Sequence, residues 1–231
     1  MKSKIFKLDI IALVIGVLGV LIFFMIWPGN IQFTKTLAKH EGIFEHLTAL
    51  FFLCGSIICI YRLAKSSKKN KMLLVFWALF CFICFGEEIS WFQRLLNYSV
   101  PAVEEKNTQN EFNIHNLKLL QPTTNWRYAI SSGKFSLRLF LGSQNIFNLG
   151  FFIYFFMLPL LMYAGKLKFI KSKLNFTIPS IYFFISVWVT IFFSIILAFL
   201  GTHEIPKLIA ETREMFFAIF ISFYIYSYLR L

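Results

Sequence analysis

The sequence predicts an all-α fold, a single membrane-embedded bundle of about six transmembrane helices. Of the 231 residues, 58% are hydrophobic and 15% are charged, whereas soluble domains are close to half apolar and a quarter charged. Phe alone occurs 31 times, and the mean hydropathy is +0.69. The apolar residues also form runs of roughly 20 residues, the length of a helix that crosses a bilayer. A chain of this size is expected to form one domain.

Each predicted helix follows one apolar run. The first run ends at Pro28-Gly29-Asn30. Its lysine-rich start resembles a signal peptide, but no small-residue cleavage site follows, which favours a retained helix. Pro206 suits the first turn of the last helix, where its missing N–H breaks no hydrogen bond. The predicted helices span residues 8–27, 42–63, 71–96, 144–164, 175–200 and 206–229, and a long loop spans residues 97–143.

Basic residues determine the predicted orientation. They cluster before the first helix, between the second and third, and between the fourth and fifth. With six helices these segments share one side, which the positive-inside rule assigns to the cytoplasm. Both termini are then cytoplasmic, the 97–143 loop is extracytoplasmic, and the chain is predicted in a bacterial inner membrane. The same clusters explain the net charge of +12 without a nucleic-acid partner, so the expected partner is the lipid bilayer.

In this orientation the acidic residues and histidines gather near the outer side. Of the eleven acidic residues only Asp9 lies near the cytoplasmic side, and all four histidines lie at the outer side. Cytoplasmic loops that avoid acidic residues would explain the loops, but not the acids within helices. Ionisable groups at membrane depth are costly and usually face a bundle interior or a wet cavity.

The second and sixth helices carry such groups in their outer thirds. Glu45 and His46 form a polar stripe at the start of the second helix. Glu211 and Glu214 of the sixth helix share a face because they are three residues apart. Arg213 lies between them, and an ion pair of Arg213 with one of these acids is the structural alternative to a functional site.

The third helix is predicted to end with Gly86-Glu87-Glu88-Ile89-Ser90-Trp91, followed by Gln93-Arg94. Glu87, Trp91 and Arg94 lie on one helical stripe. Two adjacent carboxylates after an apolar run indicate a polar pocket, because the apolar residues that follow extend the buried pattern. In the alternative, the helix stops at Gly86 and both carboxylates are solvated.

The long loop contains a segment of alternating polar and apolar residues. The polar residues Gln109, Glu111, Asn113 and His115 alternate with the apolar residues Phe112 and Ile114, which predicts an extended segment with one polar face. Long loops without regular structure are often functional. We expect the loop to pack on the bundle as a lid, and a solvated loop is the alternative.

These two segments together resemble a family of uncharacterised bacterial multi-pass membrane proteins, in which the sequence reads approximately GEEISWGQR and then NxQGExNxHNL. The resemblance lies within residues 86–116, and Phe92 and Asn110 stand where that pattern has Gly. It implies that the end of the third helix and the loop form one unit. No activity is established for that family, so the resemblance marks residues without naming a reaction.

Three functions are consistent with this sequence. The first is an integral-membrane enzyme, a hydrolase or transferase, that acts on a lipid or lipid-linked substrate at the extracytoplasmic leaflet. The second is a cation- or proton-handling transporter or channel, which the lack of ionisable residues in the inner halves of the second to sixth helices disfavours. The third is a non-catalytic assembly or sensing protein. No phosphate-binding loop, dinucleotide fingerprint or nucleophile elbow occurs.

The enzyme hypothesis assigns roles to the acidic cluster and its neighbours. So many carboxylates cannot all stay ionised together, so protons, water, a cationic substrate or a divalent metal ion must compensate them. Carboxylate and imidazole ligands suit Zn²⁺, Mn²⁺ or Fe. The predicted catalytic residues are Glu87, Glu88, Arg94, Glu111 and His115. The predicted substrate-binding residues are Trp91, Gln93, Asn113, Asn116 and Arg213. The hypothetical metal ligands are Glu45, His46, Glu87, His115, Glu211 and Glu214.

Overall fold

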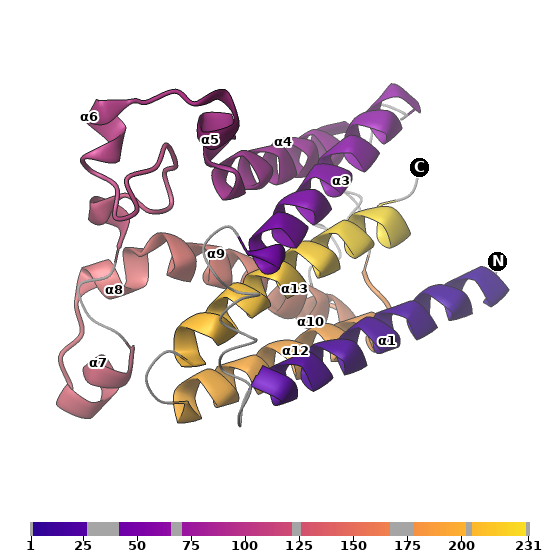
Figure 1. Ribbon diagram of the computed structural model, residues 1–231. Helices are drawn as coiled ribbons and strands as arrows, with labels where there is room; N and C mark the ends of the chain where they lie inside the picture. The colour runs from indigo at the N-terminus through magenta and orange to yellow at the C-terminus, as the bar shows by residue number, and fades with distance from the viewer. Residues whose placement is uncertain are drawn as a thin grey trace.

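The structure is a computed structural model, and it describes residues 2–26, 42–65, 71–121, 126–166, 178–201 and 205–229. The predicted all-α class is confirmed, since within these ranges the regular structure is helical apart from one isolated bridge between Asn107 and Leu117. The long helices lie along one another as a bundle (Figure 1). They are α1 (Lys2–Ile26), α3 (Ile43–Lys65), α4 (Lys71–Glu88), α12 (Ile181–Leu200) and α13 (Ile205–Tyr228).

Four helical segments in the described ranges are long and apolar enough to cross a membrane: Lys7–Ile26, Ile43–Lys65, Ser143–Tyr163 and Ile181–Leu200. Their outer faces are apolar, and side chains such as Val17 and Ile57 are more than half exposed, at 58% and 55%. Water disfavours contiguous apolar surface of this kind, whereas lipid accepts it. This composition is that of a multi-pass membrane protein.

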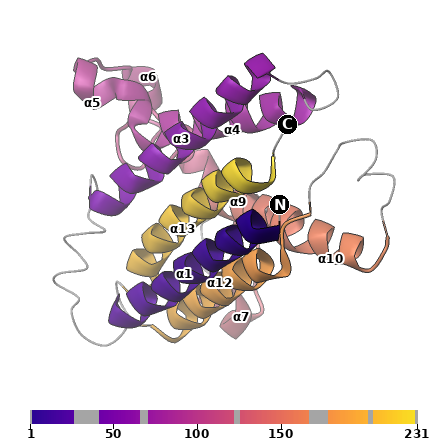
Figure 2. The ribbon, with the colours of Figure 1, turned by 90° about the vertical axis from the view of Figure 1, so that its right-hand side faces the viewer.

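Small residues let α1 and α12 approach closely. A Cβ atom added at Gly16 would lie 2.9 Å from the Cβ of Ser186, and one added at Gly19 would lie 2.6 Å from Cγ2 of Thr190. The hydroxyl of Thr190 also donates a hydrogen bond to the carbonyl of Gly16, at 3.3 Å. Such small-residue contacts are a usual means of helix association in membranes. Figures 1 and 2 show the two helices side by side.

The last helix, α13, is the centre of the bundle. It contacts α1, α3 and α12, and Figure 2 shows it between the α3–α4 pair and the α1–α12 pair. Its side chains Phe220, Tyr224 and Ile225 are fully buried, each with 0% exposure. A helix whose side chains are buried on several sides is a core helix of the bundle.

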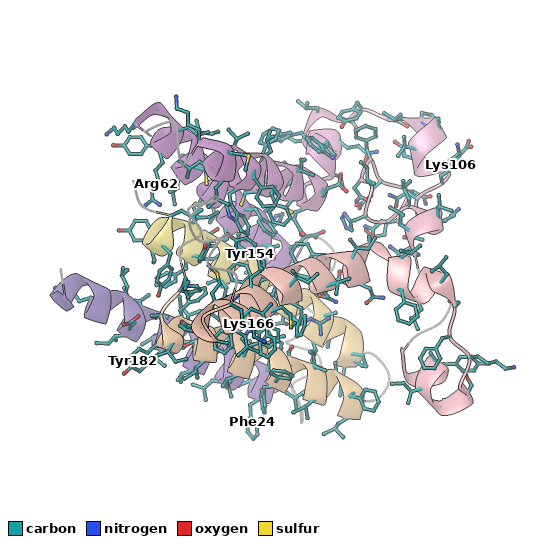
Figure 3. All side chains as sticks on the ribbon, turned by 180° about the vertical axis from the view of Figure 1, so that it is seen from behind. Phe24, Arg62, Lys106, Tyr154, Lys166 and Tyr182 are labelled. Atoms are coloured by element: carbon teal, nitrogen blue, oxygen red, sulfur yellow. The ribbon has the colours of Figure 1, made fainter. Side chains whose placement is uncertain are left out.

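The guanidinium of Arg62 caps the C-terminal end of α13. Arg62 of α3 donates hydrogen bonds to the backbone carbonyls of Ile225, Tyr226 and Leu229. The last carbonyls of a helix have no partner within the helix, so a cation there both pairs them and interacts favourably with the helix dipole. Figure 3 shows Arg62 beside this end of the bundle, while Lys106 lies at the opposite end.

The predicted fourth helix is a continuous helical rod with a change of pitch. It consists of α9 (Ser143–Phe152), a π-helical turn η4 (Ile153–Met157) and α10 (Leu158–Tyr163). Proline cannot donate to the i−4 carbonyl, and Pro159 lies two residues after the π turn, which accommodates this loss. The fifth predicted helix begins later than expected, at Ile181, where Ser180 caps it; its predicted start at 175–177 lies outside the described residues.

The third helix ends at Glu88 and not at residue 96, so the predicted 71–96 span was wrong. Ser90, Trp91 and Phe92 have φ angles of 47°, 52° and 66°. This left-handed conformation costs about 1–2 kcal/mol per non-glycine residue, so other contacts must hold it. The chain then continues through η2 (Ser90–Phe92) and α5 (Gln93–Leu96), where Leu95 is 77% exposed.

The segment that follows α5 lies at the end of the bundle opposite both termini (Figure 1). It contains α6 (Pro101–Glu104), η3 (Lys118–Leu120), α7 (Trp126–Ser132) and α8 (Leu137–Leu141). The predicted extended segment was wrong, because residues 109–115 form turns and bends, with a φ of 55° at Asn110. As a result Gln109 is exposed, while Glu111 and Asn113 are buried.

Candidate functional site

Glu87 fastens the loop to the end of α4. Its Oε2 atom accepts hydrogen bonds from the backbone N–H groups of Ile114 and His115, at 2.7 and 2.9 Å. The same atom lies 3.2 Å from Nδ1 of the His115 ring, and Oε1 accepts from the indole N–H of Trp91 at 2.8 Å. Several donors on one carboxylate make strong, charge-assisted bonds. Glu87 therefore joins α4, the left-handed turn and the loop.

A second carboxylate, Glu111, lies buried beneath the loop. The hydroxyl of Ser90 donates to Glu111 Oε2 at 2.7 Å, and Nδ2 of Asn113 donates to the same atom at 2.8 Å. Ser90 has 0% exposure and is the first residue of the left-handed turn. This contact is one of those that hold the strained turn, because strained backbone persists only where its surroundings determine it.

The remaining polar residues of the segment bond mainly to one another. Gln93 donates to Glu104 at 2.6 Å and accepts from the backbone N–H of Phe112 at 2.5 Å. Nδ2 of Asn116 donates to Oε1 of Gln109 at 2.7 Å. Gln93 and Asn116, which we predicted to bind substrate, thus hold the loop. We call residues 87–121, tied together in this way, the locked loop.

A partly open cavity of about 140 Å³ lies beside the locked loop. Its apolar lining includes Phe52 of α3 and Phe147 of α9. Helices α4, α9 and α13 and the loop also contribute polar groups, which are Glu87, Glu88, His115, Ser143, Gln144 and Glu214. The structure therefore gathers Glu87, Glu88 and His115 of the predicted catalytic set at one cavity, together with Glu214 of the predicted metal ligands.

Glu88 and Glu214 differ from Glu87 and Glu111, which are bound by donors. Among the described residues, nothing donates a hydrogen bond to either carboxyl group. The charges that act on Glu88 come from other carboxylates, which are Glu214, Glu45, Glu211 and Glu87. The structure thus brings together acids from α3, α4 and α13, and two of them face the cavity without a donor.

Aromatic rings form the wall of this cavity towards the middle of the bundle. The rings of Phe52 and Phe147 pack against Phe80, with centroid distances of 6.3 and 6.1 Å. Phe147 also contacts Phe217 at 5.5 Å, and Phe217 contacts Phe151 at 4.1 Å. The two rings that line the cavity therefore belong to a larger packed group of phenyl rings, which includes Phe80, Phe217 and Phe151.

His115 is fixed through both its backbone and its ring. Its carbonyl accepts hydrogen bonds from Oγ of Ser143 at 2.7 Å and from Nε2 of Gln121 at 2.8 Å. An ionised Glu87 can only accept, so Nδ1 of the ring carries the proton that it shares with Glu87. Nε2 of the ring then has no hydrogen-bond partner in the described part of the chain.

The surroundings of His115 favour its charged form. Burial lowers the pKa of His115, but the hydrogen bond with Glu87 and the negative charges of Glu214, Glu87 and Glu111 outweigh that effect, so its pKa lies above the ordinary value for histidine.

The predicted metal site receives no support. In the ranges that the structure describes, no three or more His, Cys, Asp and Glu side chains are grouped so that they could hold a metal ion. His46 is exposed to the outside of α3. The predicted metal ligands that this finding leaves without support are Glu45, His46, Glu87, His115, Glu211 and Glu214.

Arg94 and Arg213 are the two arginines of the predicted site, and His40 and His203 are further histidines of the predicted outer side. The side chain of Arg94 lies outside the described residues, as do His40 and His203. Arg213 is half-buried, and its Nε atom is buried without a hydrogen-bond partner. Arg213 acts electrostatically on Glu214 and does not line the cavity.

The sequence-based prediction missed Ser143 and Gln144. Both open α9 and line the cavity, and Nε2 of Gln144 is buried without a hydrogen-bond partner. A signal was present, because Ser143, Gln144, Asn145 and Asn148 are polar residues at the start of an otherwise apolar span. An apolar run that opens with several amides indicates a polar cavity at that depth.

Comparisons with protein-family models, curated proteins and solved structures gave no significant match to this chain. The resemblance of residues 86–116 to an uncharacterised membrane-protein family therefore stays a prediction.

Proposed function

We propose that this chain is an integral-membrane enzyme, a hydrolase or transferase, which acts on a lipid-like substrate at the extracytoplasmic face of the membrane. The observation that carries the proposal is the placement of the His115 ring. Glu87 holds its Nδ1 side at 3.2 Å, and the residue lines a cavity that it shares with Glu88 and Glu214. A carboxylate that orients a histidine at a cavity is a recurrent acid–base arrangement.

The roles of the residues follow from this geometry. In its neutral form, His115 accepts at Nε2 the proton of a water or substrate hydroxyl as that oxygen attacks a carbonyl carbon or phosphorus of the substrate. Glu87 is a positioning residue, which fixes the tautomer of His115 and stabilises the imidazolium that forms. Glu88 or Glu214, in its protonated form, delivers a proton to the departing oxygen. Ser143 is not the nucleophile, because its hydroxyl donates to the carbonyl of His115 and not to the ring.

A six-span topology in a bacterial inner membrane, with both termini in the cytoplasm, accompanies this proposal. Its support is that α4 packs along the candidate span α3, and that α13 contacts three candidate spans. The two termini lie at one end of the bundle, and the locked loop lies at the other (Figure 1). Lysines in the connections near the termini assign that end to the cytoplasm by the positive-inside rule.

The two alternatives explain the site less fully. For transport, an ion path would have to continue past Phe147, Phe151 and Phe217, whose rings pack at 4.1–5.5 Å. A purely structural role would account for Glu87 and Glu111, which are bound by donors. It does not account for two carboxyl groups at a cavity that have none.

The proposal is tested on purified protein in vesicles of defined lipids, with products followed by mass spectrometry. His115→Gln removes the basic nitrogen, so we expect conversion to fall by about 100-fold or more. Glu105→Gln is the matched control, because Glu105 is exposed in the loop and lies outside the cavity. Glu87→Gln is expected to shift the pH profile as well as lower the rate.

Two outcomes would overturn the proposal. One is a folded wild-type protein that converts no lipid carrying an ester, amide or phosphodiester bond. The other is a His115→Gln variant as active as the Glu105→Gln control.

A further inference from the structure

We infer that the cavity takes the head group of an aminolipid, with its primary ammonium placed between Glu88 and Glu214. This inference rests on the proposed function and deepens it by naming the substrate class. Three features of the cavity lead to it: the charge of its polar end, the rings of its wall, and an unpaired amide at the start of α9.

The charge of the polar end excludes some ligands. Glu88 and Glu214 both line the cavity, and within the described residues neither accepts a hydrogen bond. Arg213 and His115 offset part of the charge on Glu214, but the charged groups that act on Glu88 are all carboxylates. A buried carboxylate without donors is costly, so a proton or a bound cation must accompany Glu88. An anionic head group would add to the negative charge. A primary ammonium supplies three N–H donors, whereas a quaternary ammonium supplies none.

The wall of the cavity also suits a cation attached to hydrocarbon. Phe52 and Phe147 line it and pack against the same ring, Phe80. The faces of aromatic rings attract ammonium groups, and the attraction grows where water is excluded. The same rings accept the methylene groups next to the ammonium.

The unpaired amide of Gln144 indicates a second polar group in the ligand. Gln144 lines the cavity, and its Nε2 atom is buried and has no acceptor within the described chain. Buried donors nearly always find a partner, so an exception calls for an explanation such as a ligand. An aminolipid carries phosphate oxygens a few bonds from its ammonium, and one of these can accept from Gln144 while the ammonium lies between the carboxyl groups.

The size of the cavity limits what enters it. A buried cavity of roughly 150 Å³ holds a molecule as large as benzene, and this one measures about 140 Å³. An ethanolamine-type head group fits within that volume, while acyl chains must remain outside, in the bilayer. A metal ion fits the cavity less well, because no three ligating side chains of the described residues are grouped for one.

The test measures binding to the purified full-length protein in detergent, by native mass spectrometry and by the midpoint of thermal unfolding. The probes are phosphatidylethanolamine, phosphatidylcholine and phosphatidylglycerol with identical acyl chains, and free ethanolamine. We expect phosphatidylethanolamine to bind at least about tenfold more tightly than the other two lipids, a difference of roughly 1.4 kcal/mol. Free ethanolamine should compete only weakly if the lipid chains contribute to binding.

The variants Glu88→Gln and Glu214→Gln, made singly, should each remove the preference for phosphatidylethanolamine, and Glu105→Gln should keep it. Equal binding of phosphatidylglycerol by the wild type would overturn the inference without any variant, as would a preference that survives both substitutions. Phosphatidylethanolamine that binds through these carboxyl groups but is never converted would leave the inference standing and refute the enzyme. Conversion of a lipid without an amine would support the enzyme and overturn the inference of an aminolipid substrate.

Discussion

Glu87 and Glu88 are neighbours in the sequence, yet their surroundings have almost nothing in common. Glu87 accepts from two backbone N–H groups, from an indole and from an imidazole. Glu88 accepts nothing within the described chain and faces the cavity. The pair shows that one short acidic motif combines two tasks. The first glutamate builds the locked loop, and the second is left for a ligand.

The same division separates the other carboxylates of the site. Glu104 and Glu111 belong with Glu87, because side-chain and backbone donors surround them. Glu214 belongs with Glu88. Hydrogen bonds from donors offset the desolvation free energy of a buried carboxylate, so the contact stabilises the fold. A buried carboxylate without donors retains the whole desolvation cost. Substitutions should therefore act in opposite ways on the two groups.

The largest effect is expected for Glu87→Ala. It leaves the N–H groups of Ile114, His115 and Trp91 without their acceptor, and each lost charge-assisted bond is worth about 1.5–3 kcal/mol. We expect the free energy of unfolding to fall by about 3 kcal/mol and protease to cut the chain within residues 97–121. Thermal unfolding and limited proteolysis in detergent measure both.

Glu88→Gln is the matched control for that substitution. It should leave the loop protected from protease and change the free energy of unfolding by less than about 1 kcal/mol. Equal loss of stability in the two variants would show that both glutamates are structural.

An intermediate effect is expected for Gly86→Ala. The added Cβ would lie 2.8 Å from the indole ring of Trp91, which must then move away from Glu87. Overpacking of this kind costs about 1–3 kcal/mol. Gly150→Ala is the control, since nothing lies within 4 Å of a Cβ there, and alanine favours a helix over glycine by about 1 kcal/mol. If both variants unfold at the same temperature, the contact between Gly86 and Trp91 does not hold the turn.

The smallest effect is expected from pH. The pKa of His115 lies above its ordinary value, because the hydrogen bond with Glu87 and neighbouring carboxylates outweigh burial. A group whose pKa is raised on folding stabilises the fold fully below its unfolded pKa of about 6.5. That contribution is lost as pH rises through the folded value, so proteolysis of the loop should become faster above neutral pH. His115→Asn should abolish this dependence, and a dependence that persists in the variant would assign it to another group.

Sequence reasoning predicted the helices well where apolar runs decide them. The runs behind α1, α3, α9–α10 and α13 gave bounds within a few residues, except that α1 starts at Lys2. The end of α4 was missed because Leu95 and Leu96 extend the apolar pattern. Ser90 instead makes a long-range hydrogen bond to Glu111, and Trp91 makes a local one to Glu87; together they outweigh the preference for helix.

The site was predictable as a set of residues and not as a set of roles. Acids in the outer thirds of three helices indicated a common polar region, and the structure brings Glu45, Glu88 and Glu214 together. Nothing in the residue pattern distinguishes Glu87 from Glu88, because most partners of Glu87 are loop atoms far along the chain. Every residue except proline has a backbone N–H group, so the residue types do not indicate which carboxylates accept hydrogen bonds from the backbone and which accept none.

The most direct test of this division is labelling with a hydrophobic carbodiimide, which enters from the bilayer. It adds to a protonated carboxyl group to form a stable N-acylurea, and a carboxyl group in an apolar cavity without donors must hold a proton when no cation is bound. Peptide mass spectrometry should locate the label at Glu88 and Glu214, with Glu87 and Glu111 unmodified and with less label after phosphatidylethanolamine is added. Label at Glu87 equal to that at Glu88 would contradict the account.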